Sequence, residues 1–410
     1  MEAHANERIV IVGAGHGGGR MAQHLRRTGF AGSITLVGDE AELPYERPAL
    51  SKEILFGTKS PDDVKLQEAS VWAETDIDLI LSCAAAGIEA DSRRVQLTDG
   101  RDLPFDRLIL ATGGTARPLP VLGGDNPRVV SLRTMADGLA LARHLPAISR
   151  LVIIGGGVIG LEVAAAARKH GVAVTILEAG PRLMARIGPA VLSDWLLATH
   201  RAAGVDIRLG AATTAISGGT ALRVHGHDGR GDFVLDADLV LSAIGIAPAI
   251  GCLAGAGLEL RNGIVVNERC QVPGEPIYAI GDVANTYSPL YKTHVRLETW
   301  RNAENQSKAL AELLNGRIEP YVEVPWMWSD QFDRNIQVVG LWSEDADVVL
   351  RGDVGAKGSS CLYVREGRVM GGVLWDQGRD RRFLEKLVVD GKVHDMLHLS
   401  DPTVALRTLV

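Results

Sequence analysis

Arg8–Gly19 reads R-I-V-I-V-G-A-G-H-G-G-G, and Leu151–Gly160 reads L-V-I-I-G-G-G-V-I-G. In each stretch, an apolar run of the length of one buried strand leads directly into a G-x-G-x-x-G pattern. The first glycine of such a loop makes the tight turn, the second lets the backbone approach a diphosphate, and the third lets helix and strand pack closely. The free N–H groups at the start of the following helix bind the diphosphate. Two loops predict two dinucleotide sites; the alternative is that the glycines only shape turns in an α/β protein.

Length and composition bound the class of protein. The chain has 410 residues, enough for roughly two or three domains, and 46% of them are hydrophobic. A net charge of −7 gives no support for a nucleic-acid or membrane partner. No apolar run reaches about 18 residues, and the N-terminus lacks a secretory-signal pattern. The four cysteines are isolated from one another, which predicts neither a metal site nor disulfides and favours the cytoplasm.

An acidic residue follows the second strand of the first unit, where a carboxylate binds ribose hydroxyls. Ser33–Val37 is the predicted strand, and it runs into G-D-E. Asp39 is the stronger candidate and Glu40 is the other. The alternative is a charged turn without a ligand.

In the second unit, the predicted strand Val172–Leu177 ends in Glu178. A carboxylate here suits a ribose with a free 2′-hydroxyl and repels a 2′-phosphate, which favours NADH over NADPH. Arg182 and Arg186 follow closely and weaken this preference, because an arginine is able to meet such a phosphate.

Two further features lie between the strands. Leu43–Lys52 reads L-P-Y-E-R-P-A-L-S-K, and its two prolines predict a shaped loop that carries the cations Arg47 and Lys52. Glu162 stands early in an otherwise apolar helix predicted over Val158–His170. We expect its carboxylate to be buried or to line a cofactor; the alternative is a charge favoured by the helix N-terminus.

The two halves repeat one design and predict the domain order. Leu108–Ala111 is an apolar strand that runs into A-T-G-G, and Leu239–Gly245 mirrors it. Pro276–Ala284 contains I-Y-A-I-G-D-V-A, which delivers Asp282, after Gly281, to the end of a sheet. The predicted segments are 1–115, 116–245, 246–320 and 321–410.

The last segment is predicted to be a small α+β domain. Five of the seven tryptophans fall between residues 300 and 375, and the last helix is expected to begin near Asp380. A basic cluster there is either a solvated helix face or a docking patch for an acidic partner; it comprises Arg379, Arg381, Arg382 and Lys386.

Taken in order, the motifs resemble one family. They are G-A-G-H-G-G-G, Y-E-R-P-A-L-S-K, A-T-G-G, L-R-T, I-G-G-G-V-I-G-L-E, I-Y-A-I-G-D-V-A, L-E-T-W-R-N-A and W-M-W-S-D-Q. The set closely resembles the FAD-dependent, NADH-using ferredoxin reductases of bacterial oxygenase systems, which serve Rieske-type dioxygenases and ferredoxin-dependent cytochromes P450. Ala49 is a small departure, because it stands where the family usually has a second proline.

The resemblance implies an α/β fold of the glutathione-reductase type, with two Rossmann-like nucleotide-binding domains and a small C-terminal α+β domain. Lys52 would lie beside flavin N5 and pair with Glu162, and these two residues form the expected catalytic pair. The implied FAD site comprises Gly13, Ala14, Gly15, Gly18, Asp39, Glu40, Arg47, Lys52, Ala84, Ala111, Thr112, Gly113, Arg133, Gly281, Asp282, Glu298, Thr299, Trp300 and Trp328. The implied NADH site comprises Gly155, Gly157, Val158, Ile159, Gly160, Glu162, Glu178, Arg186 and Gly245.

The implied reaction takes a hydride from NADH onto FAD and passes single electrons to a plant-type or Rieske-type [2Fe–2S] ferredoxin. The related disulfide reductases carry a C-x-x-x-x-C pair where this chain reads Y-E-R-P-A-L-S-K. Because no cysteine lies between Met1 and Ile80, a thiol relay is excluded. The alternatives are a rubredoxin reductase, an NADH oxidase, or a redox-sensing binding protein like the apoptosis-inducing factors. We expect no resident metal, and a monomer or weak homodimer.

Overall fold

The computed structural model describes residues 6–219, 221–317 and 319–410, which form two compact units. Unit 1 contains the segment ending at Ala49 together with Lys59–Thr115 and Ile246–Glu323. Unit 2 contains Leu50–Thr58, Ala116–Gly245 and Val324–Val410. The chain therefore crosses between the units after Thr115 and Gly245, where the sequence predicts segment boundaries, after Glu323, three residues beyond a predicted boundary, and around the short segment 50–58, where none is predicted.

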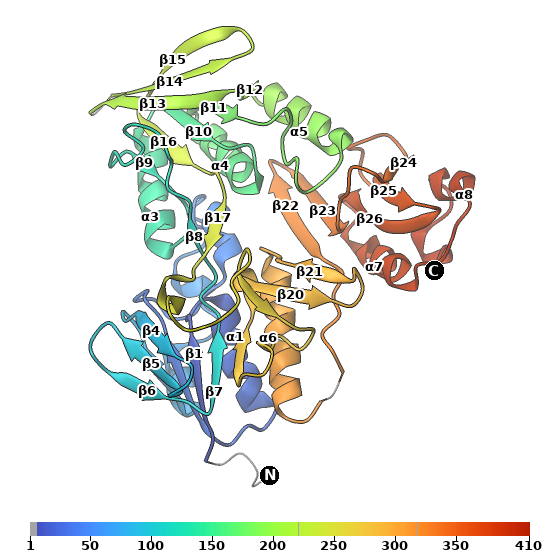
Figure 1. Cartoon of the computed structure of the whole chain (residues 1–410). Coiled ribbons are helices and arrows are strands. Elements are labelled where there is room, and N and C mark those ends of the chain that lie inside the picture. The colour runs from blue at the N-terminus through green and yellow to red at the C-terminus, as the bar shows by residue number, and fades with distance from the viewer. Residues whose placement is uncertain (1–5, 220, 318) are drawn as a thin grey trace. The chain divides into compact units, whose positions relative to one another are not determined.

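Unit 1 is built on a five-stranded parallel sheet with the order β19-β7-β1-β2-β3. Alternate side chains of β1 enter two cores: Ile9 and Ile11 pack with helix α1, and Val10 and Val12 pack on the other face. Burial on both faces explains why the strands read as continuous apolar runs. Helices α1 and α6 lie side by side (Figure 1). The bounds are Arg8–Val12 for β1, Ser33–Val37 for β2, Ile77–Ile80 for β3, Arg107–Leu110 for β7, Ile277–Ala279 for β19, His16–Arg27 for α1 and Trp300–Leu314 for α6.

Smaller elements complete unit 1. The strands β5 and β6 pair antiparallel around the turn T-D-G-R. The loop predicted over Leu43–Lys52 is partly wrong, because Arg47–Ser51 forms a 3₁₀ turn, in which Pro48 is tolerated near the start. The bounds are Ala69–Glu74 for α2, Ala85–Glu89 for β4, Arg94–Leu97 for β5, Asp102–Pro104 for β6, Gly114–Ala116 for β8, Ile246–Pro248 for β17, Ile264–Val266 for β18, Ala284–Ser288 for β20 and Thr293–Val295 for β21.

Unit 2 repeats the parallel design, with the strand order β12-β11-β10-β16-β9. The antiparallel strands β13, β14 and β15 form a separate sheet. The bounds are Val129–Val130 for β9, Arg150–Ile154 for β10, Ala173–Glu178 for β11, Asp206–Leu209 for β12, Ala212–Gly218 for β13, Leu222–Asp228 for β14, Gly231–Ala237 for β15 and Leu239–Ser242 for β16. The helices are α3 at Met135–His144, α4 at Val158–Lys169 and α5 at Ala190–Ala202.

Helix α3 is one element that the sequence pattern does not predict. Its interior contains Gly138, which weakens helix propensity. A capping box between Thr134 and Asp137 nevertheless starts the helix. A Cβ at position 138 would lie 3.1 Å from Leu50 Cδ2, so close packing accounts for the glycine.

The C-terminal part of unit 2 is a five-stranded antiparallel sheet with the order β22-β23-β26-β25-β24. It shares one core with the second glycine unit, since Ile336 and Val373 cluster with Ile153 and Leu161. The prediction that the helix near Asp380 is the last one is wrong, because α8 follows it. The bounds are Trp326–Gln331 for β22, Arg334–Gly340 for β23, Asp347–Arg351 for β24, Ser360–Arg365 for β25, Arg368–Trp375 for β26, Arg381–Asp390 for α7 and Met396–Ser400 for α8.

Candidate functional site

The first glycine loop joins β1 to α1 in a conformation that only glycines allow. Gly13 has a φ of +109°, and a Cβ there would lie 2.3 Å from the Ala111 carbonyl oxygen. A Cβ on Gly18 would lie 1.9 Å from the Gly13 carbonyl oxygen. Gly15 is the N-cap of α1, and no side chain of the described residues caps this helix. Its first N–H groups are therefore open to an anion.

The second loop repeats this geometry between β10 and α4. Gly155 has a φ of +112°, and a Cβ there would lie 2.4 Å from the Ala243 carbonyl oxygen. A Cβ on Gly160 would lie 2.3 Å from the Gly155 carbonyl oxygen. Gly157 is the N-cap of α4, again without a side-chain cap within the described ranges. Val158 and Ile159 form the first turn of α4, so unit 2 has its own candidate diphosphate site.

The acidic residues differ between the units. In unit 2, the Glu178 carboxylate accepts hydrogen bonds from the backbone N–H groups of Gly156 at 2.7 Å and Gly180 at 2.6 Å. In unit 1, Asp39 is exposed, whereas Glu40 accepts a hydrogen bond from Tyr45 at 2.7 Å. The weaker candidate of the pair is therefore the one that the surrounding side chains hold in place.

Arg47 binds Glu40 directly, with 2.5 Å between Nη2 and Oε1. Burial lowers the pKa of the Arg47 guanidinium, but the facing oxygens of Tyr45 and Glu40 raise it above its ordinary value overall. Asp282 also faces Arg47 electrostatically. Two predicted site residues of unit 1, Glu40 and Asp282, thus face a third, the cation Arg47.

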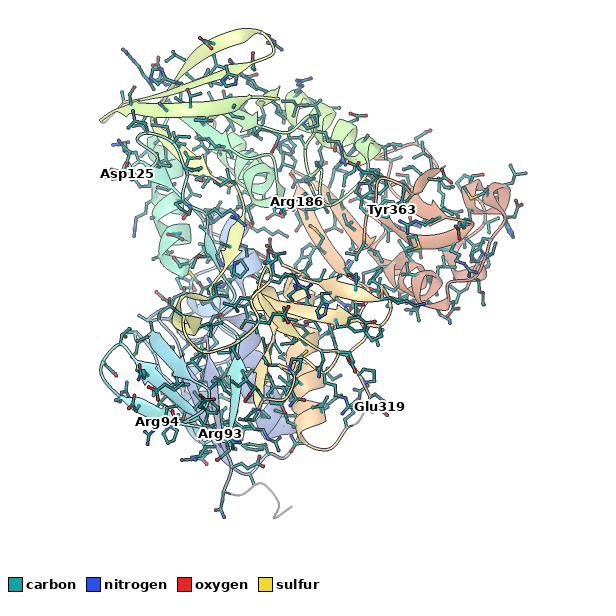
Figure 2. The ribbon with its side chains drawn as sticks, in the orientation of Figure 1. Arg93, Arg94, Asp125, Arg186, Glu319 and Tyr363 are labelled. Carbon is teal, nitrogen blue, oxygen red and sulfur yellow. The ribbon has the colours of Figure 1, made fainter. Side chains whose placement is uncertain are left out.

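Two arginines follow Glu178, and they differ in what they bind. Arg182 donates to the carbonyl oxygens of Gly188 at 2.6 Å and Ala185 at 2.9 Å, so its guanidinium is engaged by its own loop. Arg186 is exposed (Figure 2), and its Nη2 lies 3.6 Å from where a Cβ on Gly245 would be. Only Arg186 is free to turn toward a ligand of the second loop.

The other predicted residues of unit 1 lie at strand and helix ends. Thr112 donates to the Ala249 carbonyl at 2.7 Å, and the N–H of Gly281 donates to Gln306 at 2.8 Å. Thr299 is the N-cap of α6, and its side chain accepts from the N–H of Asn302. The remaining positions are Ala84 in the loop after β3, Gly113 after β7, Glu298, which pairs with Arg296 at 2.5 Å, and Trp300, whose ring centroid lies 5.2 Å from that of His16.

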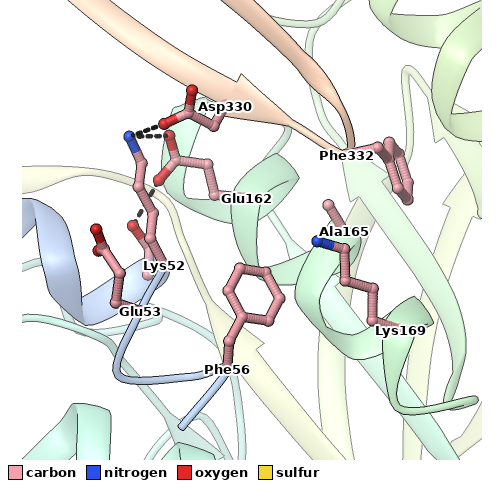
Figure 3. A pocket seen from close by; sticks show the side chains of 9 residues that line it. Lys52, Glu53, Phe56, Glu162, Ala165, Lys169, Asp330 and Phe332 are labelled. Atoms are coloured by element: carbon pink, nitrogen blue, oxygen red, sulfur yellow. Dashed lines mark hydrogen bonds and ion pairs between the residues drawn. The ribbon is translucent and has the colours of Figure 1, made fainter. Parts of the chain in front are cut away.

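Lys52, Glu162 and Asp330 come together in unit 2 (Figure 3). Lys52 Nζ lies 2.7 Å from Asp330 Oδ2 and 3.7 Å from Glu162 Oε1, so the predicted pair is joined by a second carboxylate. Asn335 holds the other Asp330 oxygen at 2.7 Å. Lys52 Nζ also lies 4.8 Å from the ring centroid of Trp328. The cluster borders a pocket of about 210 Å³ lined also by Ser51, Glu53, Phe56, Ala165, Lys169 and Phe332.

Glu162 is buried, as the sequence predicts. The hydroxyls of Ser51 and Ser329 donate to its two oxygens at 2.5 and 2.6 Å. Burial raises the pKa of the Glu162 carboxyl above its ordinary value, although Lys52 and Ser329 act in the opposite direction. Two hydroxyl donors and a nearby ammonium group hold this buried carboxylate in place. Glu162 is therefore not a solvent-exposed charge at a helix N-terminus.

Two of the four cations in the basic cluster near α7 are paired with carboxylates. Arg381 pairs with Glu385 and lies over the Trp326 ring, and Lys386 pairs with Asp390 at 2.9 Å. Arg379 and Arg382 are exposed.

A separate predicted FAD residue, Arg133, belongs to unit 2, where its backbone N–H donates to Asp137 at the start of α3.

None of the helices in the described ranges combines the length and apolar character of a membrane span. Within the same ranges, no group of three or more His, Cys, Asp or Glu side chains is arranged to hold a metal ion. Cys83, Cys252, Cys270 and Cys361 are all free. Burial raises the pKa of the Cys270 thiol to about 12.

Two glycine-loop helix starts, without side-chain caps in the part of the chain that the structure describes, and a lysine–carboxylate cluster around the buried Glu162 are typical of a dinucleotide-dependent oxidoreductase. Residues 7–307 match the family model described as pyridine nucleotide-disulphide oxidoreductase, and residues 326–410 match the reductase C-terminal family. The chain therefore belongs to the pyridine nucleotide-disulphide oxidoreductase family, whose members use a flavin and a nicotinamide cofactor. The predicted α/β fold class with its C-terminal domain is confirmed.

Relatives that align over most of the chain show which members of the family it resembles. It is 40% identical to a ferredoxin–NAD(P)⁺ reductase of a Sphingomonas species, over 88% of each chain. It is 37% identical to the ferredoxin–NAD⁺ reductase component of the anthranilate 1,2-dioxygenase system of Burkholderia cepacia, over 98% of this chain and 99% of the relative. The crystal structure of the covalent putidaredoxin reductase–putidaredoxin complex matches with a TM-score of 0.93 and 36% identity, over 99% of this chain and 98% of that one. The resemblance to ferredoxin reductases is confirmed.

Sequence reasoning missed several residues of the cluster. Asp330 and Ser329 belong to the quoted W-M-W-S-D-Q motif, yet only its tryptophans were considered as site residues. Ser51 directly precedes Lys52. The signal that was available is that both motifs place a hydroxyl beside a charged residue.

Proposed function

We propose that this protein is an FAD-dependent reductase that takes a hydride from NADH and passes single electrons to a [2Fe–2S] ferredoxin serving an oxygenase. The observation that carries the proposal is the cluster of Lys52, Glu162 and Asp330. These residues come from the loop L-P-Y-E-R-P-A-L-S-K, the second glycine helix and the W-M-W-S-D-Q strand, which lie far apart in sequence. The relatives named as ferredoxin reductases span nearly the whole chain, which supports the same assignment.

The residues of unit 1 suit FAD. Gly13 and Gly18 leave room for a diphosphate at the uncapped start of α1. Glu40, fixed by Arg47 and Tyr45, is oriented to accept a hydrogen bond from ribose, and Asp282 offers a second carboxylate. We assign the FAD domain to residues 1–115 and 246–320, the NADH domain to 116–245 and the C-terminal domain to 321–410.

The residues of unit 2 suit NADH rather than NADPH. Glu178 puts a negative charge at the strand end, where it would repel a 2′-phosphate. Arg182, the nearer cation, is engaged by Gly188 and Ala185 and is not available to offset that charge. We assign Arg186 to the adenosine side of the nucleotide.

A bound flavin would allow a two-electron hydride donor to serve a one-electron acceptor, because flavins accept a hydride and release electrons singly. Lys52 would provide positive charge beside the flavin N5 atom, which favours the more anionic reduced form. Asp330 and Glu162 hold the ammonium group in place through contacts at 2.7 and 3.7 Å. Trp328 would cover the site from the side of β22.

Arg379 and Arg382 would contribute to docking an acidic ferredoxin, since they are exposed, whereas Lys386, the third exposed cation of the basic cluster, pairs with Asp390. Reversing both charges, R379E with R382E, should raise KM for ferredoxin at low salt and leave NADH–ferricyanide turnover unchanged. Equal loss of both activities would contradict this docking role. The charge reversal at Arg223, an exposed arginine on β14, is the matched control.

The test of the function is steady-state electron transfer with purified protein. We expect a yellow protein that releases FAD on denaturation and reduces cytochrome c with NADH only when a [2Fe–2S] ferredoxin is added. A chain without flavin, or one that reduces oxygen as fast as ferredoxin, would contradict the proposal. Repeating the assay with rubredoxin in place of the ferredoxin tests the alternative that the protein is a rubredoxin reductase, which would reduce rubredoxin faster than ferredoxin.

A further inference from the structure

A buried hydrogen-bond chain connects helix α5 to Glu162. His200 on α5 is fully buried, and its Nε2 lies 2.9 Å from Gln331 Oε1. The Gln331 amide nitrogen donates to Ser329 Oγ at 2.8 Å, and Ser329 donates to Glu162 at 2.6 Å. Gln331 and Ser329 are themselves fully buried. The chain thus runs from His200 to the carboxylate beside Lys52 without reaching solvent.

The donors in this chain point in one direction. An ionised Glu162 can only accept hydrogen bonds, so Ser329 donates its single hydroxyl hydrogen to the carboxylate. The Ser329 oxygen is then left to accept from the Gln331 amide nitrogen. This fixes the amide so that its oxygen faces His200, which must present a hydrogen on Nε2. The tautomer of His200 and the orientation of every group down to Glu162 are therefore coupled.

Two features show that His200 is held in this position at a cost to the fold. Its other nitrogen, Nδ1, is buried and has no hydrogen-bond partner among the described residues. Phe332, in the two-residue turn between β22 and β23, adopts a φ of +59°, which is rare for a bulky side chain. Its ring packs against the imidazole with 5.0 Å between centroids. The strained turn holds Gln331 and Phe332 against α5.

We propose that His200 is a positioning residue for the Lys52–Glu162 pair, acting through Gln331 and Ser329 to keep two hydroxyl donors directed at the Glu162 carboxylate. The proposal rests on the proposed function, in which Lys52 and Glu162 serve the flavin. Without the Nε2 hydrogen, the Gln331 amide is free to turn over and offer its oxygen to Ser329. Glu162 then loses one donor.

The expected consequence is a change in when Glu162 takes up a proton. The groups that face Glu162 are Lys52, Asp330, Ser51 and Ser329. Burial already raises the pKa of Glu162, and the Ser329 hydrogen bond opposes that rise. Losing this donor removes part of the opposition, so Glu162 should protonate at higher pH.

The test compares variants of the holoprotein. His200→Phe removes the donor and keeps an aromatic ring for Phe332, whereas His200→Gln restores an N–H group. His227→Phe, at an exposed histidine on β14, is the matched control. The readouts are an infrared titration of the Glu162 carboxyl, assigned with Glu162→Gln, and the pH profile of the flavin midpoint potential.

We expect His200→Phe to shift the Glu162 titration and the inflection of the potential profile to higher pH. His200→Gln should restore both, and His227→Phe should leave both unchanged. Ser329→Ala should reproduce the shift, and His200→Phe in that background should add nothing further, because the two residues act on Glu162 in series. If His200→Phe does not fold, Gln331→Leu tests the same connection.

Loss of thermal stability in His200→Phe with an unchanged Glu162 titration would overturn the proposal and leave His200 a purely structural residue. Additive shifts in the double variant would also overturn it. The infrared titration needs neither NADH nor ferredoxin. A chain that binds no flavin would therefore end the proposed function, whereas an unmoved Glu162 titration in a flavin-loaded protein would end only this inference.

Discussion

The two glycine loops have the same backbone but differ at the residue that follows the first glycine. This residue is Ala14 in unit 1 and Gly156 in unit 2. In unit 1, Ala14 lies against Gly38, where a Cβ would come 2.4 Å from the Ala14 Cβ. In unit 2, Gly156 lies against Leu183 and Glu178, and a Cβ at Gly156 would come 2.6 Å from Leu183 Cδ2 and 3.2 Å from the Glu178 Cβ. The side chain at the end of the second strand is thus one of two that favour a glycine in the loop of unit 2. Because unit 1 has the side chain in its loop, its carboxylate has to come later, from Asp39 or Glu40.

The helices that follow the loops carry opposite charges at corresponding positions. Arg20 is the fifth residue of α1 and pairs with Glu304 at 2.9 Å. Glu162 is the fifth residue of α4 and is buried among serines beside Lys52. The same strand–loop–helix unit therefore carries a cation, Arg20, in one copy and an anion, Glu162, in the other. Glu162 lies beside Lys52, the lysine that we place next to the flavin.

The largest expected effect breaks either loop. Gly13→Ala and Gly155→Ala each place a Cβ within 2.4 Å of a carbonyl oxygen, at a φ that L-residues avoid. Each strained position costs roughly 1–3 kcal/mol, and the loop must also move away from its ligand. Gly13→Ala should lose flavin, and Gly155→Ala should keep flavin but lose reduction by NADH. The reverse pattern, measured by flavin content and NADH titration, would contradict the assignment of the two sites.

The next effect concerns nucleotide choice. Glu178→Ser removes the negative charge at the strand end and should improve kcat/KM for NADPH relative to NADH by roughly tenfold. Arg182→Gln should leave the ratio nearly unchanged, because that guanidinium binds its own loop. A large change in Arg182→Gln alone would contradict the engagement of this guanidinium by its own loop.

A smaller effect sharpens the exchange between loop and strand. Gly156→Ala should destabilise unit 2 because its Cβ would lie 2.6 Å from Leu183 Cδ2 and also meets the Glu178 side chain. Adding Glu178→Gly gives unit 2 the pattern of Ala14 and Gly38 and should recover about 1 kcal/mol, a part of the lost unfolding free energy, because the contact with Leu183 remains. Chemical denaturation of the two single variants and the double variant measures this coupling. Strict additivity would contradict the packing argument.

The smallest effect is in the pH dependence of stability. Burial raises the pKa of Glu162 in the folded chain, so wild type should gain stability relative to Glu162→Gln as pH falls from above that raised pKa toward the ordinary glutamate value. Burial acts in the same direction on Glu304, but His16, His24 and Arg20 outweigh it and lower the pKa.

Wild type should therefore lose stability relative to Glu304→Gln as pH falls through and below the ordinary glutamate value. Unfolding free energies measured at a series of pH values should give slopes of opposite sign for the two pairs. Slopes of the same sign would contradict the contrast between the two helices.

Local patterns predicted the parts of the fold that local chemistry decides. The strand–glycine–helix units around Gly13 and Gly155 follow from apolar runs and backbone sterics, and both were predicted. Helix α5, which carries His200, was not predicted, because no cap or turn signal was recognised before Ala190. Its contact with Gln331 joins residues 131 positions apart, which no local pattern encodes.

The site shows the same division. Lys52 and Glu162 were singled out because each is chemically unusual in its own segment. Asp330 is the closer partner of Lys52, at 2.7 Å, but the two residues are 278 positions apart and Asp330 lies on a strand that was not predicted. Such partners are determined by packing of the whole unit, as the shared core of α4 and the C-terminal sheet illustrates.

The most direct test of the central claim is anaerobic stopped-flow with the purified protein. NADH should bleach the flavin absorbance rapidly and NADPH should do so much more slowly. Mixing the reduced protein with an oxidised [2Fe–2S] ferredoxin should then restore the flavin absorbance as the ferredoxin is reduced. Rapid bleaching by NADH without onward transfer to plant-type or Rieske-type ferredoxin would contradict the claim that this chain is a ferredoxin reductase.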